Sequence, residues 1–231
     1  MMMMKIFRAL GYIAFSLMLL LGLLCGAILS IGGSAQYMNT LFLRHADPGV
    51  TGVDTAEYPA LAQKITAYLL GQADTFQTTL SVHGQTREAF SEKELTHMQD
   101  VRNLFALCKT LLIVSIVCVL LWLILAFIYQ HGLSQLTART YLITSACLAV
   151  LGLGLAIWAA IDFHTLFTLF HKVFFTNDLW QLDPKQDLLL QLMPTGFFVD
   201  YAARIGLFWL CGAMIFAIAA CIYLKKRKQR T

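Results

Sequence analysis

The stretch TLLIVSIVCVLLWLILAFIYQ, residues 110–130, decides the fold of this chain. None of its side chains is charged, and about 20 apolar residues are enough for a helix to cross ~30 Å of hydrocarbon. Similar apolar runs occupy residues 10–31, 141–161 and 205–224. The sequence therefore predicts an all-α membrane protein with four transmembrane helices, the second of them covering residues 104–130 once its less apolar first turn is included.

The composition agrees with a membrane protein. The chain has 231 residues, of which 58% are hydrophobic and only 13% charged, whereas soluble domains carry about 25% charged residues. Lys5 and Arg8 precede the first apolar run and small residues follow it at 33–35, so a cleaved signal peptide is the alternative reading of this run. The run is long for a signal peptide, which favours an uncleaved anchor.

Charge placement predicts the orientation. Basic residues without any acidic neighbour occupy the N-terminus, the loop 131–140 and the tail KKRKQR at 225–230, while all thirteen Asp and Glu residues lie in the other two polar segments. The positive-inside rule then places both termini in the cytoplasm, and residues 32–103 and 162–204 outside it. The basic tail could also suggest nucleic-acid binding, but beside a last span it is better explained as a topology signal.

The six cysteines fall in or at the edge of the apolar runs, and none lies within the long polar segments. No disulfide framework is therefore expected outside the membrane. This placement argues against a thiol-oxidising membrane protein, which would need exposed paired cysteines.

The first outer segment predicts a small, mostly helical region. Apolar residues at helical spacing indicate a short helix that ends at Gly71, namely Tyr58, Leu61, Ile65 and Leu69. Residues 77–82 suggest a strand. Ser91 and Glu94 then form a capping box, so a helix is expected to begin at Ser91 and to continue into the second span. That helix carries His97 and Asp100, which share a face because they are three residues apart.

The second outer segment mixes polar groups into a Phe- and Leu-rich stretch, which is typical of a membrane–water interface. His164 and His171 are seven residues apart and would point the same way on a helix that ends at Asn177 and Asp178. Asp183 with Pro184 is predicted to begin a second short helix. The expected interface anchors are Trp180, Phe197 and Phe198.

Two histidines with nearby carboxylates suit general acid–base chemistry if the outer ends of the second and third spans converge. Simpler readings remain open at this point: a solvated surface residue for His97, a backbone-bonded interface residue for His171, and capping groups for Asp100 and Asp178. His45 and His83 have no partner nearby in sequence. Neither an HExxH motif nor a close His/Cys grouping supports a zinc site.

Two stretches carry a resemblance to a known family: SEKELTHMQDVRNLF at 91–105 and FHKVFFTNDLWQLDPKQDLLLQLMPTGFF at 170–198. They resemble the bacterial lipoprotein intramolecular transacylases, four-span membrane proteins. The resemblance implies transfer of the sn-2 acyl chain of a diacylglyceryl-cysteine lipoprotein to the α-amine of its N-terminal cysteine, giving an N-acyl lyso-form. The implied partners are these lipoproteins and membrane lipid, with no nucleic acid, no metal and no cofactor.

The resemblance also implies roles for individual residues. His97 and His171 are the expected catalytic pair, with Asp100 and Asp178 as supporting residues. The chemistry also needs a stabiliser for the tetrahedral oxyanion, for which Arg102, Asn177 or a charged histidine are the candidates. His164 is the alternative to His171. The remaining alternatives are a non-catalytic membrane scaffold and a metal- or haem-binding membrane protein.

Overall fold

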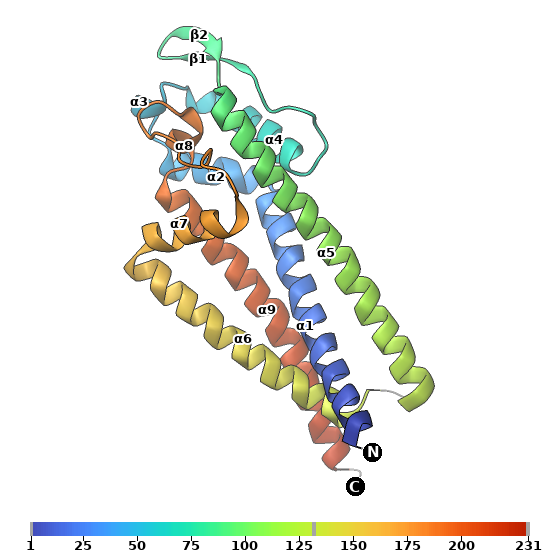
Figure 1. Cartoon of the computed structure of the whole chain (residues 1–231). Helices are drawn as coiled ribbons and strands as arrows, with labels where there is room; N and C mark the ends of the chain where they lie inside the picture. Colours follow the sequence, from blue (N-terminus) through green and yellow to red (C-terminus); the bar gives the residue numbers. More distant parts are fainter. Residues whose placement is uncertain (1, 131–132, 230–231) are drawn as a thin grey trace. The chain divides into compact units, whose positions relative to one another are not determined.

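Four long helices dominate the computed structural model, which describes residues 2–130 and 133–229 (Figure 1). They are long and apolar enough to cross a membrane, and they are α1 (Met2–Gly32), α5 (Glu92–Gln130), α6 (Gln135–Ile161) and α9 (Thr195–Lys228). The predicted all-α, four-span membrane fold is thereby confirmed. The side of the membrane on which each end lies stays a prediction.

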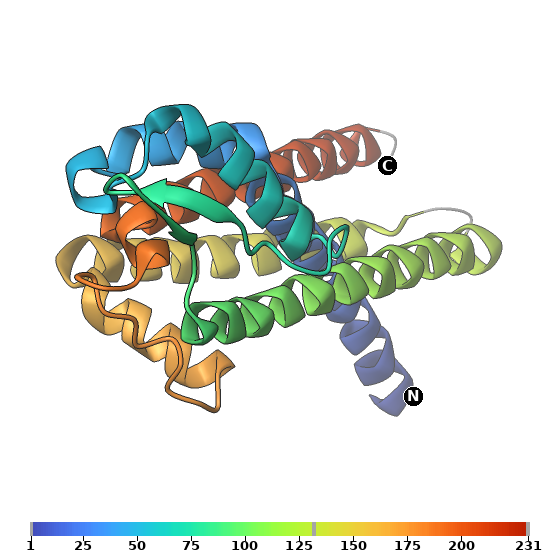
Figure 2. The same ribbon diagram turned by 90° about the horizontal axis from the view of Figure 1, so that it is seen from above.

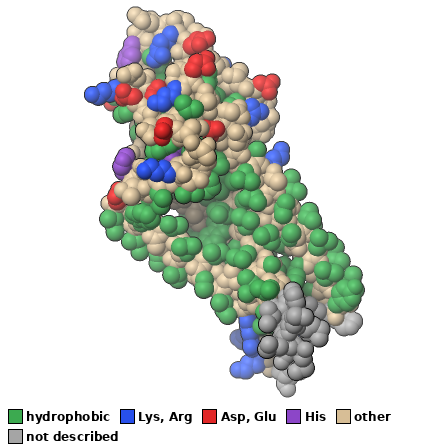
Figure 3. Space-filling view, viewed as in Figure 1, with side chains coloured by type: hydrophobic (Ala, Val, Ile, Leu, Met, Phe, Trp, Pro, Cys, Tyr) green, Lys and Arg blue, Asp and Glu red, His purple; other side chains and the backbone are tan. Residues whose placement is uncertain are grey.

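The chain divides into two compact units. The apolar unit comprises residues 1–27, 109–157 and 205–231, and the polar unit comprises Ile28–Cys108 and Trp158–Arg204. Every Asp and Glu residue of the chain belongs to the polar unit. Figure 3 shows these red side chains gathered over the shorter elements, whereas green hydrophobic side chains cover the long helices. The polar unit is therefore the place to look for charged or titratable catalytic groups.

Helices in the apolar unit are joined through polar atoms of otherwise apolar side chains. The Tyr141 hydroxyl on α6 donates to the Ala213 carbonyl oxygen on α9 at 2.8 Å, and the Trp209 Nε1–H on α9 donates to the Leu20 carbonyl on α1 at 2.9 Å. Most other apolar side chains on these helices stay exposed; Phe127, for example, is 75% exposed. Helices that are apolar on all sides and exposed in this way suit a lipid environment.

The polar unit is built on two helices that pack together, α2 (Ala35–His45) and α4 (Tyr58–Leu69), as Figure 2 shows. Between them lie the short turns α3 (Pro48–Thr51) and η1 (Thr55–Glu57). The Phe42 ring on α2 contacts both Tyr58 on α4 and Phe197 at the start of α9, at centroid distances of 5.8 and 5.7 Å. The predicted face of α4 is confirmed, because all four of its expected apolar residues are buried. Phe197 is also buried, so its prediction as an interface anchor was wrong.

A β-hairpin follows α4, formed by β1 (Thr79–Val82) and β2 (Gln85–Glu88). His83 and Gly84 make the turn with φ angles of 50° and 77°, the positive values that a two-residue type I′ turn requires. The sequence predicted the first strand two residues too early. It missed the second strand because all four of its side chains are exposed and show no apolar alternation.

The capping box that begins α5 is confirmed and extends further than the sequence indicated. Glu94 Oε2 accepts the Ser91 backbone N–H at 2.7 Å, and Ser91 Oγ accepts the Glu94 N–H at 3.3 Å. The second oxygen of Glu94, Oε1, accepts the backbone N–H of Leu189 at 2.6 Å. Leu189 lies in the first turn of α8 (Leu188–Leu192), so Glu94 caps both helices while only 2% exposed.

The predicted helix start at Asp183 was wrong. Asp183 Oδ1 accepts the N–H of Lys185 and heads a turn, and α8 begins only at Leu188. Asp187 explains the delay, since its buried carboxylate accepts the Asp183 N–H at 2.6 Å and folds this segment back on itself. The N-cap residue Asp187 makes no side-chain cap bond, which leaves this role to Glu94.

We expect Glu94→Ala to lower the free energy of unfolding by about 2–4 kcal/mol, because two backbone N–H groups lose their acceptor. Thermal or denaturant unfolding of the detergent-solubilised protein would measure this change. Glu92→Ala is the matched control, since it removes the same charge from an exposed position in the same helical turn. Equal losses in the two variants would contradict the proposed double cap.

Candidate functional site: a buried histidine pair

Helix α7 (Phe163–Phe174) carries two histidines with different environments. Asp162 begins the helix by accepting the Thr165 N–H at 3.0 Å. His164, in its first turn, is exposed, whereas His171, in its last turn, is only 5% exposed. The structure therefore separates the two alternatives, and His171 is the histidine that lies in the protein interior.

The hydrogen bond of His171 fixes the roles of its ring nitrogens. Nδ1 lies 2.7 Å from the carbonyl oxygen of Phe167. A carbonyl can only accept, so Nδ1 carries the proton and Nε2 keeps its lone pair in the neutral ring. His171 is thus bonded to the backbone, as the simpler reading has it. The same bond keeps the ring in the tautomer whose Nε2 is unprotonated, which is the form that a base requires.

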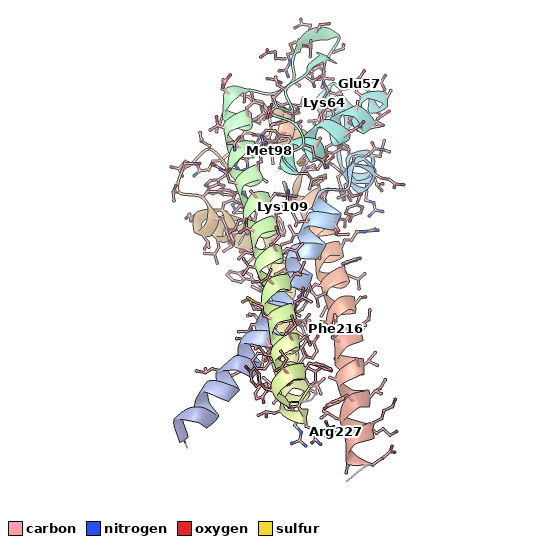
Figure 4. The ribbon with its side chains drawn as sticks, turned by 90° about the vertical axis from the view of Figure 1, so that its right-hand side faces the viewer. Glu57, Lys64, Met98, Lys109, Phe216 and Arg227 are labelled. Carbon is pink, nitrogen blue, oxygen red and sulfur yellow. The ribbon has the colours of Figure 1, made fainter. Side chains whose placement is uncertain are left out.

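His97 lies one turn after the capping box of α5, beside Met98, which Figure 4 labels. It is 8% exposed, so the reading of His97 as a solvated surface residue was wrong. Its ring centroid lies 5.9 Å from that of His171. Its Nδ1 is buried without a hydrogen-bond partner among the described residues. Such an unsatisfied group is costly, and its persistence marks a place where a ligand atom could bind.

Aromatic rings enclose the pair. Phe175 contacts both imidazoles at 5.4 Å, and Trp180 lies over His171 at 4.8 Å with an interplanar angle of 31°. Phe167 lies one helical turn before His171 on α7, and the centroids of the two rings are 4.1 Å apart. Trp180 was expected only as an interface anchor, and its contact with His171 was missed because nothing in the sequence indicates that the loop 175–182 turns back onto α7.

Burial controls the protonation of both histidines. Desolvation lowers the pKa of His97 to about 4, helped by the neighbouring His171 and opposed by the Asp100 carboxylate. Desolvation also lowers the pKa of His171, opposed by its bond to the Phe167 carbonyl. Both residues precede or follow the apolar runs and lie outside the predicted spans. At neutral pH the site therefore holds two neutral imidazoles.

One predicted supporting carboxylate belongs to this site and the other does not. Asp100 Oδ2 accepts the Asn177 Nδ2–H at 2.8 Å, and Asn177 Oδ1 accepts the Leu179 N–H at 3.0 Å. This pair ties the His97 turn of α5 to the loop that carries Trp180. Asp178 is exposed, and its Oδ1 accepts from Gln181 instead, so the structure does not bring it to the histidines.

Arg102 lies on another face of α5. Its guanidinium stacks over the Tyr68 ring at 4.7 Å, and the Tyr68 hydroxyl donates to Gln99. Five residues after His97, a helical side chain points about 140° away from it. No described interaction joins Arg102 to the histidine pair, so its expected role as an oxyanion stabiliser gains no support.

A second polar cluster joins α2 to α9, and sequence reasoning missed it. Asp200 Oδ2 lies 2.8 Å from His45 Nε2 and 2.8 Å from Arg44 Nη1. These bonds, from His45 first and Arg44 second, lower the pKa of Asp200. The sequence shows no partner close to His45 because Asp200 is 155 residues away. Gly196 permits the approach, since a Cβ there would lie 2.7 Å from His45 Nδ1.

The fold and the site together define a multi-pass membrane protein with a buried, neutral histidine pair outside its apolar spans, an arrangement suited to proton transfer at the membrane surface. Within the described ranges, no three His, Cys, Asp or Glu side chains gather as a metal site would require. Comparison with known families shows to which family the chain belongs. Residues 13–198 match the profile described as lipoprotein intramolecular transacylase Lit, so the chain belongs to the lipoprotein intramolecular transacylase family.

Solved structures agree with this assignment at the level of fold. The membrane integral lipoprotein intramolecular transacylase Lit from Bacillus cereus is 21% identical, with a TM-score of 0.76 over 96% of this chain and 97% of that one. A variant of the same protein with a histidine replaced by alanine gives 22% identity and a TM-score of 0.73, covering 99% and 98%. The comparison with curated proteins finds no match. The predicted family, and with it an acyl-transferring enzyme, is confirmed.

We expect stability to fall as the pH is lowered from about 6.5 to 4. His97 has a folded-state pKa near 4, below the unfolded value of 6.5, so the unfolded chain binds more protons in this range. The loss is of the order of 3 kcal/mol when complete. Melting temperature against pH would measure it, with His97→Gln as the comparison. An equal pH dependence in both proteins would contradict the burial of His97 as a neutral ring.

Proposed function

We propose that His171 is the general base and His97 the oxyanion-binding donor of an O-to-N acyl transfer on diacylglyceryl lipoproteins. Family membership supports acyl transfer as the reaction. The observation that carries the residue assignment is the pair of complementary ring atoms: His171 Nε2 with a lone pair, and His97 Nδ1 buried without a partner. Their ring centroids are 5.9 Å apart.

His171 suits the role of base because burial keeps it unprotonated. An α-amine has a pKa near 8, so at neutral pH only a fraction of it is unprotonated and able to attack the ester carbonyl. Once the nitrogen has formed its bond to the acyl carbon, it must lose one further proton. A neutral imidazole whose other nitrogen is held by the Phe167 carbonyl is oriented to accept that proton at Nε2. The lowered pKa of His171 keeps this form available below pH 6.5.

His97 suits the stabilisation of negative charge rather than cationic acid catalysis. With a pKa of about 4 it is not an imidazolium at neutral pH. A neutral ring that carries its proton on Nδ1 can still donate a hydrogen bond to the tetrahedral oxyanion, and in a water-poor site such a bond is strong. Asp100 and Asn177 act as positioning residues that fix the turn of α5 carrying His97.

The proposed steps balance without a further reactant. A bond forms between the α-amine nitrogen and the sn-2 acyl carbon, and the bond from that carbon to the glycerol oxygen breaks. The proton lost by nitrogen passes to His171 Nε2 and then to the departing glycerol oxygen. Because amine and ester belong to one molecule, holding them in line supplies a large effective concentration. The product is an N-acyl lyso-lipoprotein of unchanged mass.

The same proposal places the site on the extracytoplasmic side. All acidic residues belong to the polar unit together with the histidine pair, while the basic N-terminus, loop 131–140 and tail belong to the apolar unit. The positive-inside rule supports a cytoplasmic position for the latter segments.

We expect His171→Ala to lower the transfer rate by about 10²–10⁴-fold and His97→Ala by about 10²–10³-fold. Mass spectrometry of N-terminal lipopeptides, from cells that otherwise make only the diacylglyceryl form, would report whether one acyl chain has moved from glycerol to nitrogen. His164→Ala is the matched control, because it removes an exposed histidine from the same helix. Full transfer by well-expressed His97→Ala and His171→Ala would leave the membrane scaffold as the better description.

We further expect Trp180→Leu to slow transfer by about 5–30-fold, whereas Trp180→Phe keeps most activity. The indole face lies over His171, so it stabilises the imidazolium formed during proton transfer, and leucine removes this cation–π contribution of about 1–2 kcal/mol. The pH dependence of transfer and the NMR titration of His171 would show a lower pKa in the leucine variant. Identical profiles in the two variants would contradict the role of the π face.

A further inference from the structure

Helix α7 divides cleanly into a polar and an apolar face. When its residues are placed about 100° apart around the helix axis, the polar ones fall in one continuous arc, and they are His164, Thr165, Thr168, His171 and Lys172. Apolar residues fill the rest of the circumference. Four of them are between 44% and 68% exposed and form the α7 apolar face, namely Leu169, Phe170, Val173 and Phe174.

The two faces of α7 match the two layers at the surface of a membrane. An exposed group of large apolar side chains marks a surface that another apolar partner covers. A short helix with such a face and a polar opposite side lies flat at a membrane surface, with its apolar side on the acyl chains. Lys172 is exposed on the polar side, and its long side chain can hold the ammonium group among the lipid phosphates.

The path of the chain brings α7 to the lipid. The third span, α6, ends at Ile161, which is 80% exposed, and its last turn carries Trp158, a residue typical of membrane interfaces. Only Asp162 separates α6 from the first residue of α7. Because one residue spans less than about 4 Å, α7 begins where the third span leaves the hydrocarbon. Lipid is therefore adjacent to α7, whereas a protein partner would have to be recruited.

We propose that the α7 apolar face is a membrane-docking surface, covered by the acyl chains of the leaflet next to the polar unit. The face reaches the histidine pair, since the exposed Phe170 ring contacts His171 at a centroid distance of 5.4 Å. Docking therefore holds His171 at the level where lipid esters lie. This last consequence rests on the proposed function, while the docking itself does not.

Photocross-linking of the full-length protein in phosphatidylglycerol–phosphatidylethanolamine nanodiscs tests the docking. Benzoylphenylalanine replaces either Phe174, on the apolar face, or Lys172, exposed on the polar face, and mass spectrometry of the intact protein counts lipid adducts after illumination. We expect about tenfold more lipid adducts at position 174. Equal adducts at both positions would overturn the proposal. A cross-linked dimer in place of lipid adducts at 174 would assign the face to a second copy of the chain.

A pair of charge substitutions tests the consequence for the reaction. Val173→Asp adds a charge to the apolar face, and Thr165→Asp adds the same charge at an exposed position on the polar face of the same helix. We expect Val173→Asp to slow transfer on lipoproteins in vesicles by about 5–20-fold and Thr165→Asp by less than about twofold, because a charge is costly only among acyl chains. Equal slowing in the two variants would contradict a lipid-facing Val173. The cross-linking needs no turnover, so a protein without transfer activity would refute the proposed function and leave the docking result standing.

Discussion

The burial of two imidazoles against each other is the constraint on which the site depends. His97 and His171 lie 5.9 Å apart, and neither shows a described hydrogen bond to a carboxylate. Two imidazolium rings at this distance would repel each other strongly in a poorly solvated place. At most one of the two histidines can therefore be positively charged at a time. The enclosing aromatic rings maintain this restriction by keeping water away. The pair can therefore accept one additional proton but not two. An acyl transfer within one molecule requires no more, because the amine nitrogen gives up a single proton.

Several distant contacts hold the two rings in place. Glu94 fixes the beginning of α5 and caps α8, while Asp100 ties the next turn of α5 to Asn177. These carboxylates accept hydrogen bonds from backbone or amide N–H groups and not from the imidazoles. The acidic residues of the site thus set geometry, and Asp100 affects the protonation of His97 only as a modest opposing charge. This division keeps the histidines neutral without leaving the turns that carry them unsupported.

Local parts of this arrangement could be predicted from the sequence, and distant ones could not. The capping box and the shared face of His97 and Asp100 depend on spacings of three residues, which helical geometry fixes. The Asp100–Asn177 and His45–Asp200 bonds join residues 77 and 155 positions apart, and no periodic pattern records such pairs. Asp178 illustrates the difficulty: the resemblance implied it as a supporting residue, whereas in the structure its neighbour Asn177 bonds to Asp100 and Asp178 accepts from Gln181.

The protonation states narrow the possible mechanisms further than residue identity does. A pair of histidines in sequence suggests one base and one cationic acid, but a pKa of about 4 removes the cationic acid at neutral pH. If His97 cannot give up a proton from an imidazolium, the proton needed by the departing glycerol oxygen has to come from His171, which has just received it from the amine. In the proposed mechanism one histidine then acts as base and acid in turn, and the neighbouring imidazole donates a hydrogen bond to the oxyanion. This mechanism requires His171 to reach the amine nitrogen and the glycerol oxygen from one position. The hydrogen bond of its Nδ1 to the Phe167 carbonyl and the contact with Trp180 hold the ring in one orientation.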